Sequence, residues 1–461
     1  MSQANTFAQK NKIGAILRRK SKVLFVGIGG IGMQSLAILL SVRGHTVLGT
    51  DRAPSKESLC RLSSYGIEVH RGHTAEAAAH CDMLVFSLAV PYSSPELMYA
   101  RACGIPCFSR ADILGYLMAH YPARVGVAGM HGKSTVTAML AAILEEDGKD
   151  PTVVSGAPLS FGGAPLRMGG GEIFLAEACE YGNSFLSLSP TLAVVLNAEL
   201  EHTDFFHSED EVRASFAAFM QGADTVVLPA APTRVPLEVP PVARILRFGT
   251  ENGADVQAKD LTYTDGKTYF DLYIAGKNCG RVEFELLGIH NVQNATAAAA
   301  AAHALGASPA ATVRALSAFR GAPMRLERKG EREGVLLFAD YAHHPTEIRA
   351  SLAALRLLAA ARGGRLLCLF QPHTYSRTAS FFCDFVNALS AADRVILLEI
   401  YAAREQNESG VSSVSLAASL PNAIFARDHA TALSHLCAEA RAGDVAVIMG
   451  AGDIHLVFSL L

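Results

Sequence analysis

A glycine-rich loop with a lysine and two hydroxyl groups is the part of the sequence best suited to chemistry. Residues 129–135 read GMHGKST, between a strand-like run, ARVGVA, and a helix-like run, TVTAMLAAILEE. Backbone N–H groups of such a loop can cradle phosphates, the Lys133 ammonium can neutralise phosphate oxygens, and the Ser134 hydroxyl can bind magnesium. Val127 stands where the commonest form has its first glycine, so the loop is a shorter variant. We predict that it binds ATP through Gly129, His131, Gly132, Lys133, Ser134 and Thr135.

Acidic and imidazole side chains follow two runs that look like neighbouring strands of a parallel sheet. Glu177 and Glu180 end the run IFLAEACE, and His202 and Asp204 follow the run TLAVVLN. Because the carboxyl ends of parallel strands meet at one edge of a sheet, we expect these side chains to face the phosphates. Magnesium prefers oxygen ligands, so Ser134 and Glu177 are predicted to bind one ion. His202 indicates a second, weaker site that would also accept manganese, or a contact through water.

A second glycine pattern lies near the start of the chain. Gly27, Gly29 and Gly32 form G-x-G-x-x-G between a strand-like and a helix-like run, and Asp51 ends the next strand-like run. The pattern requires only a diphosphate at a helix N-terminus, where glycines let the backbone approach and N–H groups bind the anion. NAD and a sugar nucleotide such as a UDP-sugar both meet this requirement. The predicted binding residues are Gly27, Gly29, Gly30, Gly32 and Asp51.

Short apolar runs alternate with helical patterns in three stretches of the chain, which predicts an α/β fold with parallel sheets. A chain of 461 residues also exceeds the roughly 250 to 300 residues at which one hydrophobic core stops growing. We predict a Rossmann-like domain over 1–120, a P-loop ATP-binding domain over 121–325 and an α/β domain with a Rossmann-like sheet over 326–461. Within the second, residues 223–282 predict antiparallel hairpins at Asp-Gly and Ala-Gly turns, and NATAAAAAAHALG predicts a packed helix ending at Gly306.

The composition argues against several classes of protein. The formal net charge is −3, and the basic cluster at residues 18–22 is short, so no nucleic acid is expected as a partner. The nine cysteines are scattered singly without a C-x-x-C pair, which indicates neither a disulfide framework nor a zinc site and favours a reducing cytoplasm. No signal-peptide core or membrane-crossing run is recognised, so we expect a cytoplasmic protein without a membrane partner.

Six segments, in this order, resemble the muramyl (Mur) ligase family: GMHGKST, EACEYGNSFL, NAELEHTDFF, GIHNVQNATAAAA, DYAHHPTE and FQPHTYSRT. The resemblance implies three domains, for a UDP-sugar, for ATP and for an incoming amino acid. It also implies amide-bond formation: a carboxylate of the sugar takes the γ-phosphate of ATP, and the amine of the amino acid then displaces phosphate from the acyl phosphate. The first glycine loop is then expected to bind UDP rather than NAD.

Within the family, the pair DYAHHPTE and FQPHTYSRT and the opening GIGGIGM resemble members that add L-alanine to UDP-N-acetylmuramate in peptidoglycan precursor synthesis. EACEY is similar to their Gram-positive form. The implied substrates are UDP-N-acetylmuramate, L-alanine and ATP, with Mg²⁺, and two ions are expected. We expect a monomer or a homodimer, and closure of the three domains during catalysis.

The resemblance assigns further roles by position. His290 and Asn294 are expected to contact adenine, while Asn291 could instead cap the helix that starts there. Arg325 and Asp340 are expected near the nucleotide, and the amino-acid pocket is expected to contain Tyr341, His343, His373 and Arg377. The expected catalytic residues are Lys133, His343, His373 and Arg377. Pro345 and Pro372 are predicted to stiffen the two pocket loops.

The sequence departs from the commoner family pattern at a few positions. Cys179 and Asn183 stand where aspartates are frequent, and Ser134 replaces threonine. Met324 and Leu326 flank Arg325 where arginine and phenylalanine are usual. None of these changes removes a group that the predicted phosphate or metal site requires.

Three alternatives remain open. A recycling ligase that attaches a whole tripeptide to the same UDP-sugar would share the ATP-binding loop, and only its acceptor pocket would differ. If the protein were an NAD-dependent oxidoreductase or a dinucleotide-binding regulatory protein, the first glycine loop would be accounted for. The GKST loop would then have no function. An inactive nucleotide-binding relative would have no need of Lys133, Glu177 and Arg377 together.

Overall fold

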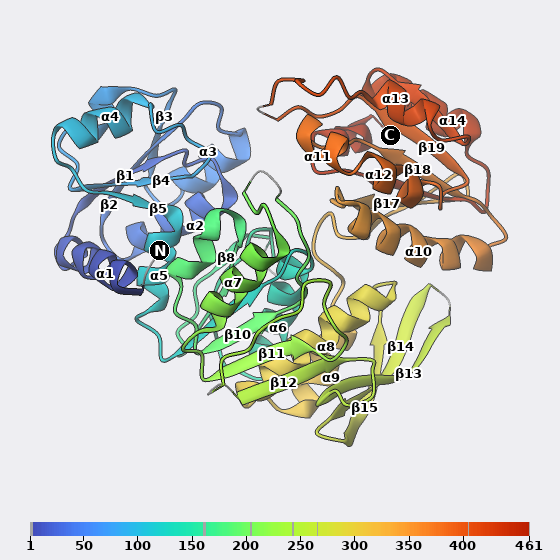
Figure 1. The fold of residues 1–461 in the computed structure, drawn as a ribbon, viewed down its shortest axis with the longest axis horizontal. Helices are drawn as coiled ribbons and strands as arrows, with labels where there is room; N and C mark the ends of the chain where they lie inside the picture. The colour runs from blue at the N-terminus through green and yellow to red at the C-terminus, as the bar shows by residue number, and fades with distance from the viewer. Residues whose placement is uncertain are drawn as a thin grey trace. The chain divides into compact units, whose positions relative to one another are not determined.

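The strand and helix alternation seen in the sequence produces three sheets in the computed structural model, which Figure 1 shows coloured along the chain. The structure describes residues 3–159, 163–202, 205–241, 244–264, 266–403 and 405–460. Their sheets have five, ten and six strands, and crossover helices connect most of the parallel strands. The predicted α/β class with parallel sheets is confirmed.

The chain forms two compact units. The first contains Met1–Gln257, Leu272–Gly280 and Asn294–Leu316, and the second contains Ala258–Asp271, Arg281–Gln293 and Ser317–Leu461. This division does not test the predicted boundaries at residues 120 and 325, which stay predictions. Among the described residues, no helix is both long and apolar enough to cross a membrane. All nine cysteines are free thiols.

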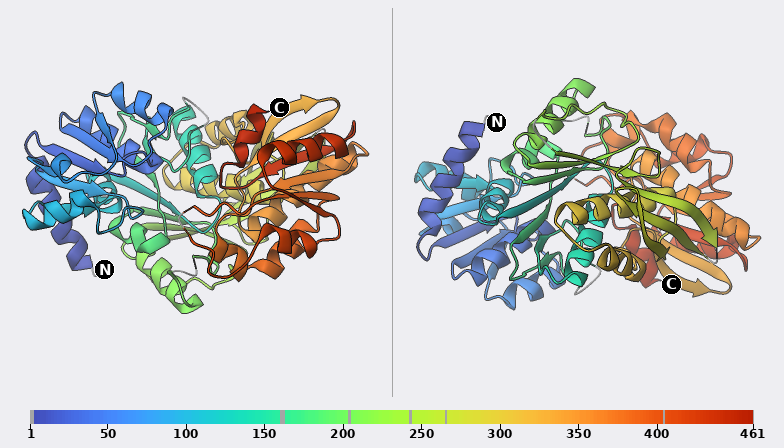
Figure 2. Two further views of the ribbon diagram at one scale, coloured as in Figure 1. Left: turned by 90° about the horizontal axis from the view of Figure 1, so that it is seen from above. Right: turned by 90° about the horizontal axis from the view of Figure 1, so that it is seen from below.

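The first sheet is parallel, with strand order β3-β2-β1-β4-β5. Val23 and Phe25 of β1 pack on one side with residues of α1, α2 and α5, while Leu24 and Val26 pack on the other with α4, so both faces are buried (Figure 2). Burial on both faces explains why the central strands β1 and β4 are apolar, whereas the edge strand β3, EVHR, is largely exposed. The strands are β1 (Lys22–Val26), β2 (Thr46–Asp51), β3 (Glu68–Arg71), β4 (Met83–Phe86) and β5 (Cys107–Ser109). The helices are α1 (Gln3–Leu17), α2 (Ile31–Val42), α3 (Lys56–Ser63), α4 (Pro95–Ala102) and α5 (Arg110–Met118).

The ten-stranded sheet has the order β15-β14-β13-β12-β11-β10-β6-β9-β7-β8. Its middle strands are parallel, and β8 pairs antiparallel with β7. The connection between β14 and β15 is Ala275-Gly276, with φ of +49° and +76°, which is the hairpin turn predicted there. Asp265 of the predicted Asp-Gly turn lies outside the described residues. The strands are β6 (Ala123–Ala128), β7 (Thr152–Val154), β8 (Leu166–Arg167), β9 (Ile173–Glu177), β10 (Leu192–Val195), β11 (Thr225–Pro229), β12 (Arg244–Gly249), β13 (Val256–Thr264), β14 (Lys267–Ile274) and β15 (Lys277–Phe284).

Four α-helices and a short 3₁₀ segment belong to this part of the chain. The alanines of α8 are fully buried from Ala297 to Ala302, and Gly306 follows the helix with φ of +72°, as the sequence predicts. The strands β13, β14 and β15 and the helix α8 each have residues in both units. The helices are α6 (Lys133–Glu146), α7 (Glu209–Met220), α8 (Ile289–Ala304), α9 (Pro309–Ala318) and the 3₁₀ segment η2 (Tyr181–Ser187).

Within the first unit, α5 packs directly against η2. A Cβ atom added to Gly115 of α5 would lie 2.1 Å from the carbonyl oxygen of Ser187, so only glycine fits there. The Ser187 hydroxyl also donates a hydrogen bond of 3.0 Å to Asp112 of α5. One continuous apolar core runs from the first sheet through this contact to Phe185, which stacks on Phe219 of α7.

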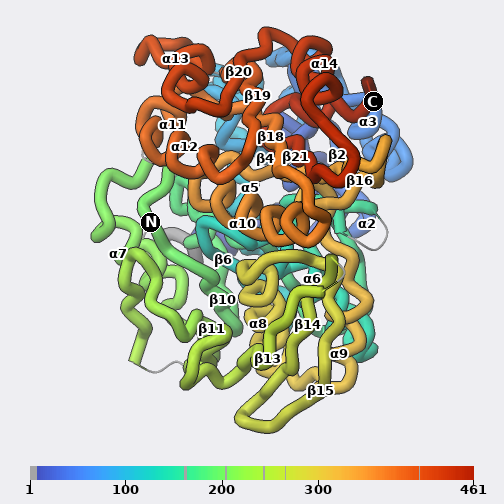
Figure 3. The backbone as a smooth tube through the Cα atoms, turned by 90° about the vertical axis from the view of Figure 1, so that its right-hand side faces the viewer, coloured from blue at the N-terminus to red at the C-terminus, as the bar shows by residue number. Residues whose placement is uncertain are grey.

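The third sheet lies in the second unit and has the order β16-β17-β21-β18-β19-β20. β16 is antiparallel and the other strands are parallel. Alternate residues of β18 pack with α10 and α12 on one face and with α14 on the other. Figure 3 labels β18 and these helices along the backbone. The strands are β16 (Glu327–Arg332), β17 (Val335–Asp340), β18 (Leu366–Phe370), β19 (Arg394–Leu398), β20 (Ala423–Ala426) and β21 (Val445–Met449). The helices are α10 (Pro345–Ala361), α11 (Tyr375–Ser380), α12 (Phe382–Leu389), α13 (Ser413–Ala418) and α14 (His429–Glu439).

Candidate active site

The GKST loop, called the phosphate loop below (residues 129–135), connects β6 to α6. Gly129 and Gly132 have φ of +141° and +86°, which side-chain-bearing residues rarely adopt. A Cβ on Gly132 would also lie 2.6 Å from the side-chain oxygen of Asn294. The N-cap residue of α6 is Gly132, which has no side chain to cap the helix, so the first N–H groups and the positive end of the helix dipole are suited to an anion.

Lys133 is held at this loop by hydrogen bonds. Its ammonium group donates to the carbonyl oxygens of Gly129 (2.5 Å) and Met130 (3.1 Å) and to both carboxylate oxygens of Glu180 (3.0 and 2.9 Å). Burial lowers the pKa of Lys133, but Glu180 raises it, and the net shift is upward. Burial likewise raises the pKa of Glu180, but Lys133 and His202 lower it, and the net shift is downward. Both members of the pair therefore stay charged at neutral pH.

The candidate metal ligands lie at the same edge of the sheet. The Ser134 hydroxyl donates to Glu177 at 3.1 Å, and Glu177 also accepts hydrogen bonds from the Ser155 hydroxyl and the Gly156 N–H group. A hydroxyl and a carboxylate at this separation form a donor set that suits magnesium, which prefers oxygen. Asp204 lies outside the described residues.

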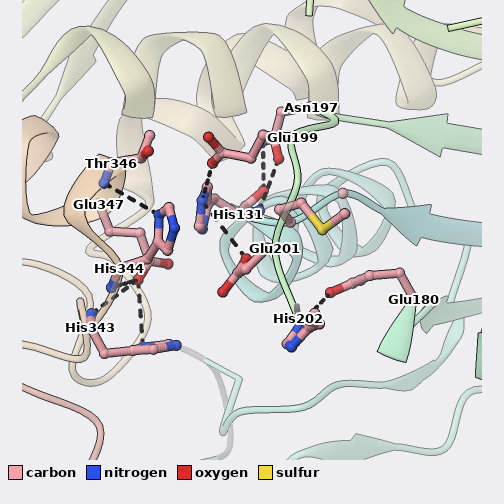
Figure 4. Close-up of polar contacts among 12 residues, drawn as sticks. His131, Glu180, Asn197, Glu199, Glu201, His202, His343, His344, Thr346 and Glu347 are labelled. Atoms are coloured by element: carbon pink, nitrogen blue, oxygen red, sulfur yellow. Dashed lines mark hydrogen bonds and ion pairs between the residues drawn. The ribbon is translucent and has the colours of Figure 1, made fainter. Parts of the chain in front are cut away.

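His202 approaches Glu180 rather than Glu177. Its Nε2 atom lies 3.2 Å from a Glu180 oxygen, and its backbone has φ of +54°. Figure 4 shows this pair beside the phosphate loop. The expectation that the strands preceding these residues are neighbours is wrong, because β6 lies between β9 and β10. The side chains still converge, since both strands flank the strand that leads into the phosphate loop.

Residues that sequence reasoning missed tie the phosphate loop to the segment after β10. The His131 N–H group donates to the Asn197 side-chain oxygen, and the Asn197 amide donates to the His131 carbonyl, both at 2.9 Å. The His131 imidazole Nε2 lies 2.5 Å from Glu199 and 4.0 Å from Glu201. Figure 4 draws both contacts as dashed lines. The polar residues of NAELEH could have been predicted as site residues. They follow a strand whose carboxyl end was expected at the ligand-binding edge of the sheet.

The first glycine loop (residues 27–32) connects β1 to α2. The Gly29 N–H group donates a hydrogen bond of 2.8 Å to the Asp51 carboxylate, which also accepts from the Ala53 N–H group at 3.0 Å. Gly27 has φ of +80° and would clash with Val90 if it carried a Cβ atom. The Asp51 carboxylate at the end of β2 is therefore already bonded to this loop, so a diphosphate there needs an additional positive charge.

Arg110, at the start of α5, supplies such a charge and was missed from the sequence. A Cβ on Gly32 would lie 3.1 Å from its guanidinium nitrogen, so the two groups are in contact. Within the described part of the chain, Arg110 makes no hydrogen bond or ion pair. Burial and Glu180 raise the pKa of the Cys179 thiol, while Lys133 and Arg110 lower it, with a net upward shift. Arg110 thus lies within electrostatic range of both the first glycine loop and the residue before Glu180.

In the second unit, four rings form a row. Tyr341 contacts His343 (5.6 Å between centroids), His343 contacts His373 (5.9 Å), and His373 stacks on Tyr401 (5.6 Å). The Arg377 guanidinium lies 3.3 Å from Nδ1 of His373. The structure therefore brings together all four residues predicted for the amino-acid pocket.

Burial is the largest cause of the pKa shifts of the ionisable side chains in this part of the second unit. Burial lowers the pKa of His343 to about 3 and that of His290 to about 4, and burial with the Arg377 charge lowers the pKa of His373. Burial raises the pKa of Asp340, at the end of β17, to about 6, although the Ser351 hydroxyl and Arg325 act against it. The imidazoles are therefore neutral at pH 7, and a neutral His373 can accept a hydrogen bond from Arg377.

Arg325 lies between two residues with strained backbone in the same unit. Met324 and Leu326 both have positive φ, +59° and +46°. The Arg325 guanidinium lies 5.2 Å from the centre of the Tyr341 ring and 3.8 Å from Glu347. Such strain costs about 1 to 3 kcal/mol per residue and is typical of functional sites.

Other predicted positions have different local roles. Pro345 is the first residue of α10, which is capped by His344, so it begins a helix rather than stiffening a loop as predicted. The Asn291 side chain donates to the Leu287 carbonyl from inside α8 and is not the residue that precedes the helix. His290 and Asn294 lie one turn apart on α8, and the buried Nδ1 atom of His290 has no hydrogen-bond partner among the described residues.

Three family models match this chain over most of its length. Residues 22–122 match "Mur ligase family, catalytic domain", residues 127–302 match "Mur ligase middle domain", and residues 324–452 match "Mur ligase, glutamate ligase domain".

Among curated proteins, the UDP-N-acetylmuramate–L-alanine ligase of Caldanaerobacter subterraneus subsp. tengcongensis is 36% identical over 96% of this chain and 97% of its own length. The ligase of the same description from Desulfatibacillum aliphaticivorans is 39% identical over 95% and 98%. The solved UDP-N-acetylmuramate–alanine ligase of Thermotoga maritima has a TM-score of 0.80 at 26% identity, covering 95% of this chain and 98% of its own. The murein peptide ligase of Psychrobacter arcticus has a TM-score of 0.70 at 25% identity, covering 96% and 98%.

Proposed function

The chain belongs to the Mur ligase family, as its motifs predicted, and from this premise we propose that it joins L-alanine to UDP-N-acetylmuramate while converting ATP to ADP and phosphate. The observation that carries the proposal is full-length similarity, at 36% to 39% identity, to ligases of this specificity. The product is a precursor of peptidoglycan. ATP is the nucleotide that the family uses, and the phosphate loop is its proposed site.

We propose three substrate regions that follow the predicted domains 1–120, 121–325 and 326–461. The UDP-sugar binds the first glycine loop, with Arg110 compensating the charge of Asp51. ATP binds the phosphate loop, with α8, Arg325 and Asp340 contacting its adenosine part. L-alanine binds beside the row of rings in the second unit, where Arg377 presents a planar fork to a carboxylate.

Transfer of the γ-phosphate to the sugar's carboxylate brings two anions together, so the site must supply positive charge. Lys133 supplies it: its ammonium leaves the carbonyls of Gly129 and Met130 to meet phosphate oxygens, while Glu180 keeps it protonated. Magnesium, held by Ser134 and Glu177, would further neutralise the phosphates, and His202 is proposed for a second ion. Neutral His343 and His373 then face the amine without repelling it. We also propose that the domains close around the acyl phosphate and exclude water.

The proposed cellular location is the cytoplasm, because ATP and UDP-sugars are made there. A monomer or a homodimer remains our expectation. A tripeptide-recycling ligase is the second candidate, because the murein peptide ligase of Psychrobacter arcticus shares the fold at a TM-score of 0.70. The higher identity to L-alanine ligases favours the first candidate.

The test is ATP-dependent phosphate release with UDP-N-acetylmuramate and Mg²⁺, with L-alanine, glycine, L-serine, each later amino acid or the tripeptide as acceptor. We expect release with L-alanine. Phosphate release with the tripeptide instead would establish recycling. If none of these acceptors gave phosphate release, ligase activity would be rejected altogether. NAD binding without ATP turnover would favour the oxidoreductase or regulatory class.

A further inference from the structure

The phosphate loop is clamped to the segment after β10 by one amide side chain. Asn197 accepts a hydrogen bond from the His131 N–H group and donates one to the His131 carbonyl, each at 2.9 Å. An amide that pairs with both backbone groups of one residue fixes the orientation of the two peptide planes beside that residue. The plane after His131 carries the Gly132 N–H group, which is expected to meet the phosphates, whereas the His131 N–H group is already bonded to Asn197.

A second contact holds the His131 side chain. Its Nε2 atom lies 2.5 Å from an oxygen of Glu199, whose residue is only 6% exposed. A proton must lie between the two atoms, so the imidazole is directed to the carboxylate. The ring therefore anchors the loop to the same segment that Asn197 holds.

Gly129, two residues before His131, also lies close to this segment. A Cβ on Gly129 would lie 3.0 Å from the Leu196 side chain and 3.2 Å from the Asn197 nitrogen. The loop thus lies flat on residues 196–199 at three successive points, through Gly129, the His131 backbone and the His131 ring.

We propose that Asn197 and Glu199 are positioning residues that hold the phosphate loop, through His131, in the conformation that binds ATP; this inference rests on the proposed function. A loop with two glycines at positive φ loses much conformational freedom when it orders around phosphates. A clamp formed before ATP arrives removes that loss from the binding step. Neither residue needs to touch ATP to have this effect.

The test compares Asn197→Ala and Glu199→Gln with the wild-type enzyme. Asn197→Ala should lower kcat/KM for ATP by about 10- to 100-fold, because both His131 backbone groups lose their partner. Glu199→Gln should lower it by about 3- to 10-fold, since a neutral hydrogen bond replaces a charge-assisted one. The KM values for UDP-N-acetylmuramate and L-alanine should not change. Arg234→Gln is the matched control, because Arg234 is 66% exposed and lies 3.3 Å from the other oxygen of Glu199; its kinetics should match the wild type.

A second readout separates positioning from a general structural role. ATP should raise the Tm of the wild type and of Arg234→Gln, and this rise should shrink in both clamp variants while their Tm without nucleotide changes little. The double variant should lose less than the product of the two single losses, because both act through one loop. If Asn197→Ala does not fold, Glu199→Gln carries the test alone.

Unchanged kcat/KM for ATP in the folded variants would overturn the clamp. So would equal losses for all three substrates together with a lower Tm without nucleotide. A wild-type enzyme that forms no product with any acceptor would instead reject the proposed function, and the ATP-induced rise in Tm would still measure the clamp.

Discussion

The charge state of buried ionisable side chains differs between the two units. At the phosphate loop of the first unit, the buried Lys133 ammonium is paired with the Glu180 carboxylate, and both keep their charge. In the second unit, burial dominates and moves Asp340, His343 and His373 toward their neutral forms.

The difference follows from what each region is proposed to handle. Triphosphate chemistry needs a permanent cation, and a buried lysine keeps its proton only beside a carboxylate. An incoming amine is handled better by neutral imidazoles than by imidazolium ions, which would repel its protonated form. Pairing therefore preserves charge in one unit, whereas desolvation removes it in the other.

The largest expected effect comes from breaking the charge pair. Lys133→Ala should lower ATP-dependent product formation by about a thousandfold or more, because the phosphates lose their fixed cation. It should also lower the free energy of unfolding by about 3 kcal/mol, since Glu180 is left buried without its partner. The double variant Lys133→Ala/Glu180→Gln should recover stability without activity. Activity near wild type in either variant would contradict the role of Lys133.

The next prediction concerns the buried Asp340 of the second unit and the pH dependence of the free energy of unfolding. The folded-state pKa of Asp340, about 6, lies above its usual value of 3.8, so its ionisation opposes folding as the pH rises. Asp340→Asn should therefore raise the free energy of unfolding by up to about 3 kcal/mol at pH 8, with no gain below pH 4. Denaturant titrations at both pH values measure this. A gain that does not depend on pH would show that Asp340 ionises normally.

Arg377 is a charged residue beside the row of rings, and its geometry can be tested separately from its charge. Arg377→Lys keeps the charge but removes the planar fork, so kcat/KM for L-alanine should fall by about 30-fold while KM for ATP stays constant. Arg427→Lys is the control, because Arg427 is 84% exposed and forms an ion pair with its neighbour Asp428. Equal kinetics for Arg377→Lys and wild type would rule out recognition by the fork.

Arg110 gives the smallest expected effect, and its variant tests the cation beside the first glycine loop. Arg110→Ala should weaken binding of UDP-N-acetylmuramate by about tenfold, measured by calorimetry without ATP, because the Asp51 charge would no longer be compensated. Arg19→Ala, on an arginine that is 75% exposed, should bind like the wild type. If Arg110→Ala binds normally, the diphosphate does not meet this guanidinium.

Local chemistry made much of the fold predictable. The two glycine loops, their flanking strands and helices and the Ala275-Gly276 turn are specified by residues within a few positions of each other. Three of the four rings in the second unit, Tyr341, His343 and His373, were assigned to one pocket by motif resemblance, whereas Tyr401 was not predicted.

Features that depend on long-range packing were not predictable in this way. Arg110 is remote in sequence from Gly32, and no local pattern links them. The order β10-β6-β9 is a property of sheet topology, so adjacent runs in the sequence misled the assignment of neighbours. The helix α1 was missed because its sequence has no apolar stripe of helical period, and its packing on α5 became evident only in the fold.

The contact at Gly115 has a consequence for recombining these enzymes. Since α5 and η2 meet without room for one extra carbon atom, the surfaces of the first and second sheets are fitted to each other at backbone level. A chimera could take residues 1–120 from one relative and the following residues from another. Its α5 and η2 would then come from different proteins, and their backbones would not fit together at this contact. Useful crossover points in the first unit therefore lie outside the segment from α5 to η2, so that the two helices are exchanged together.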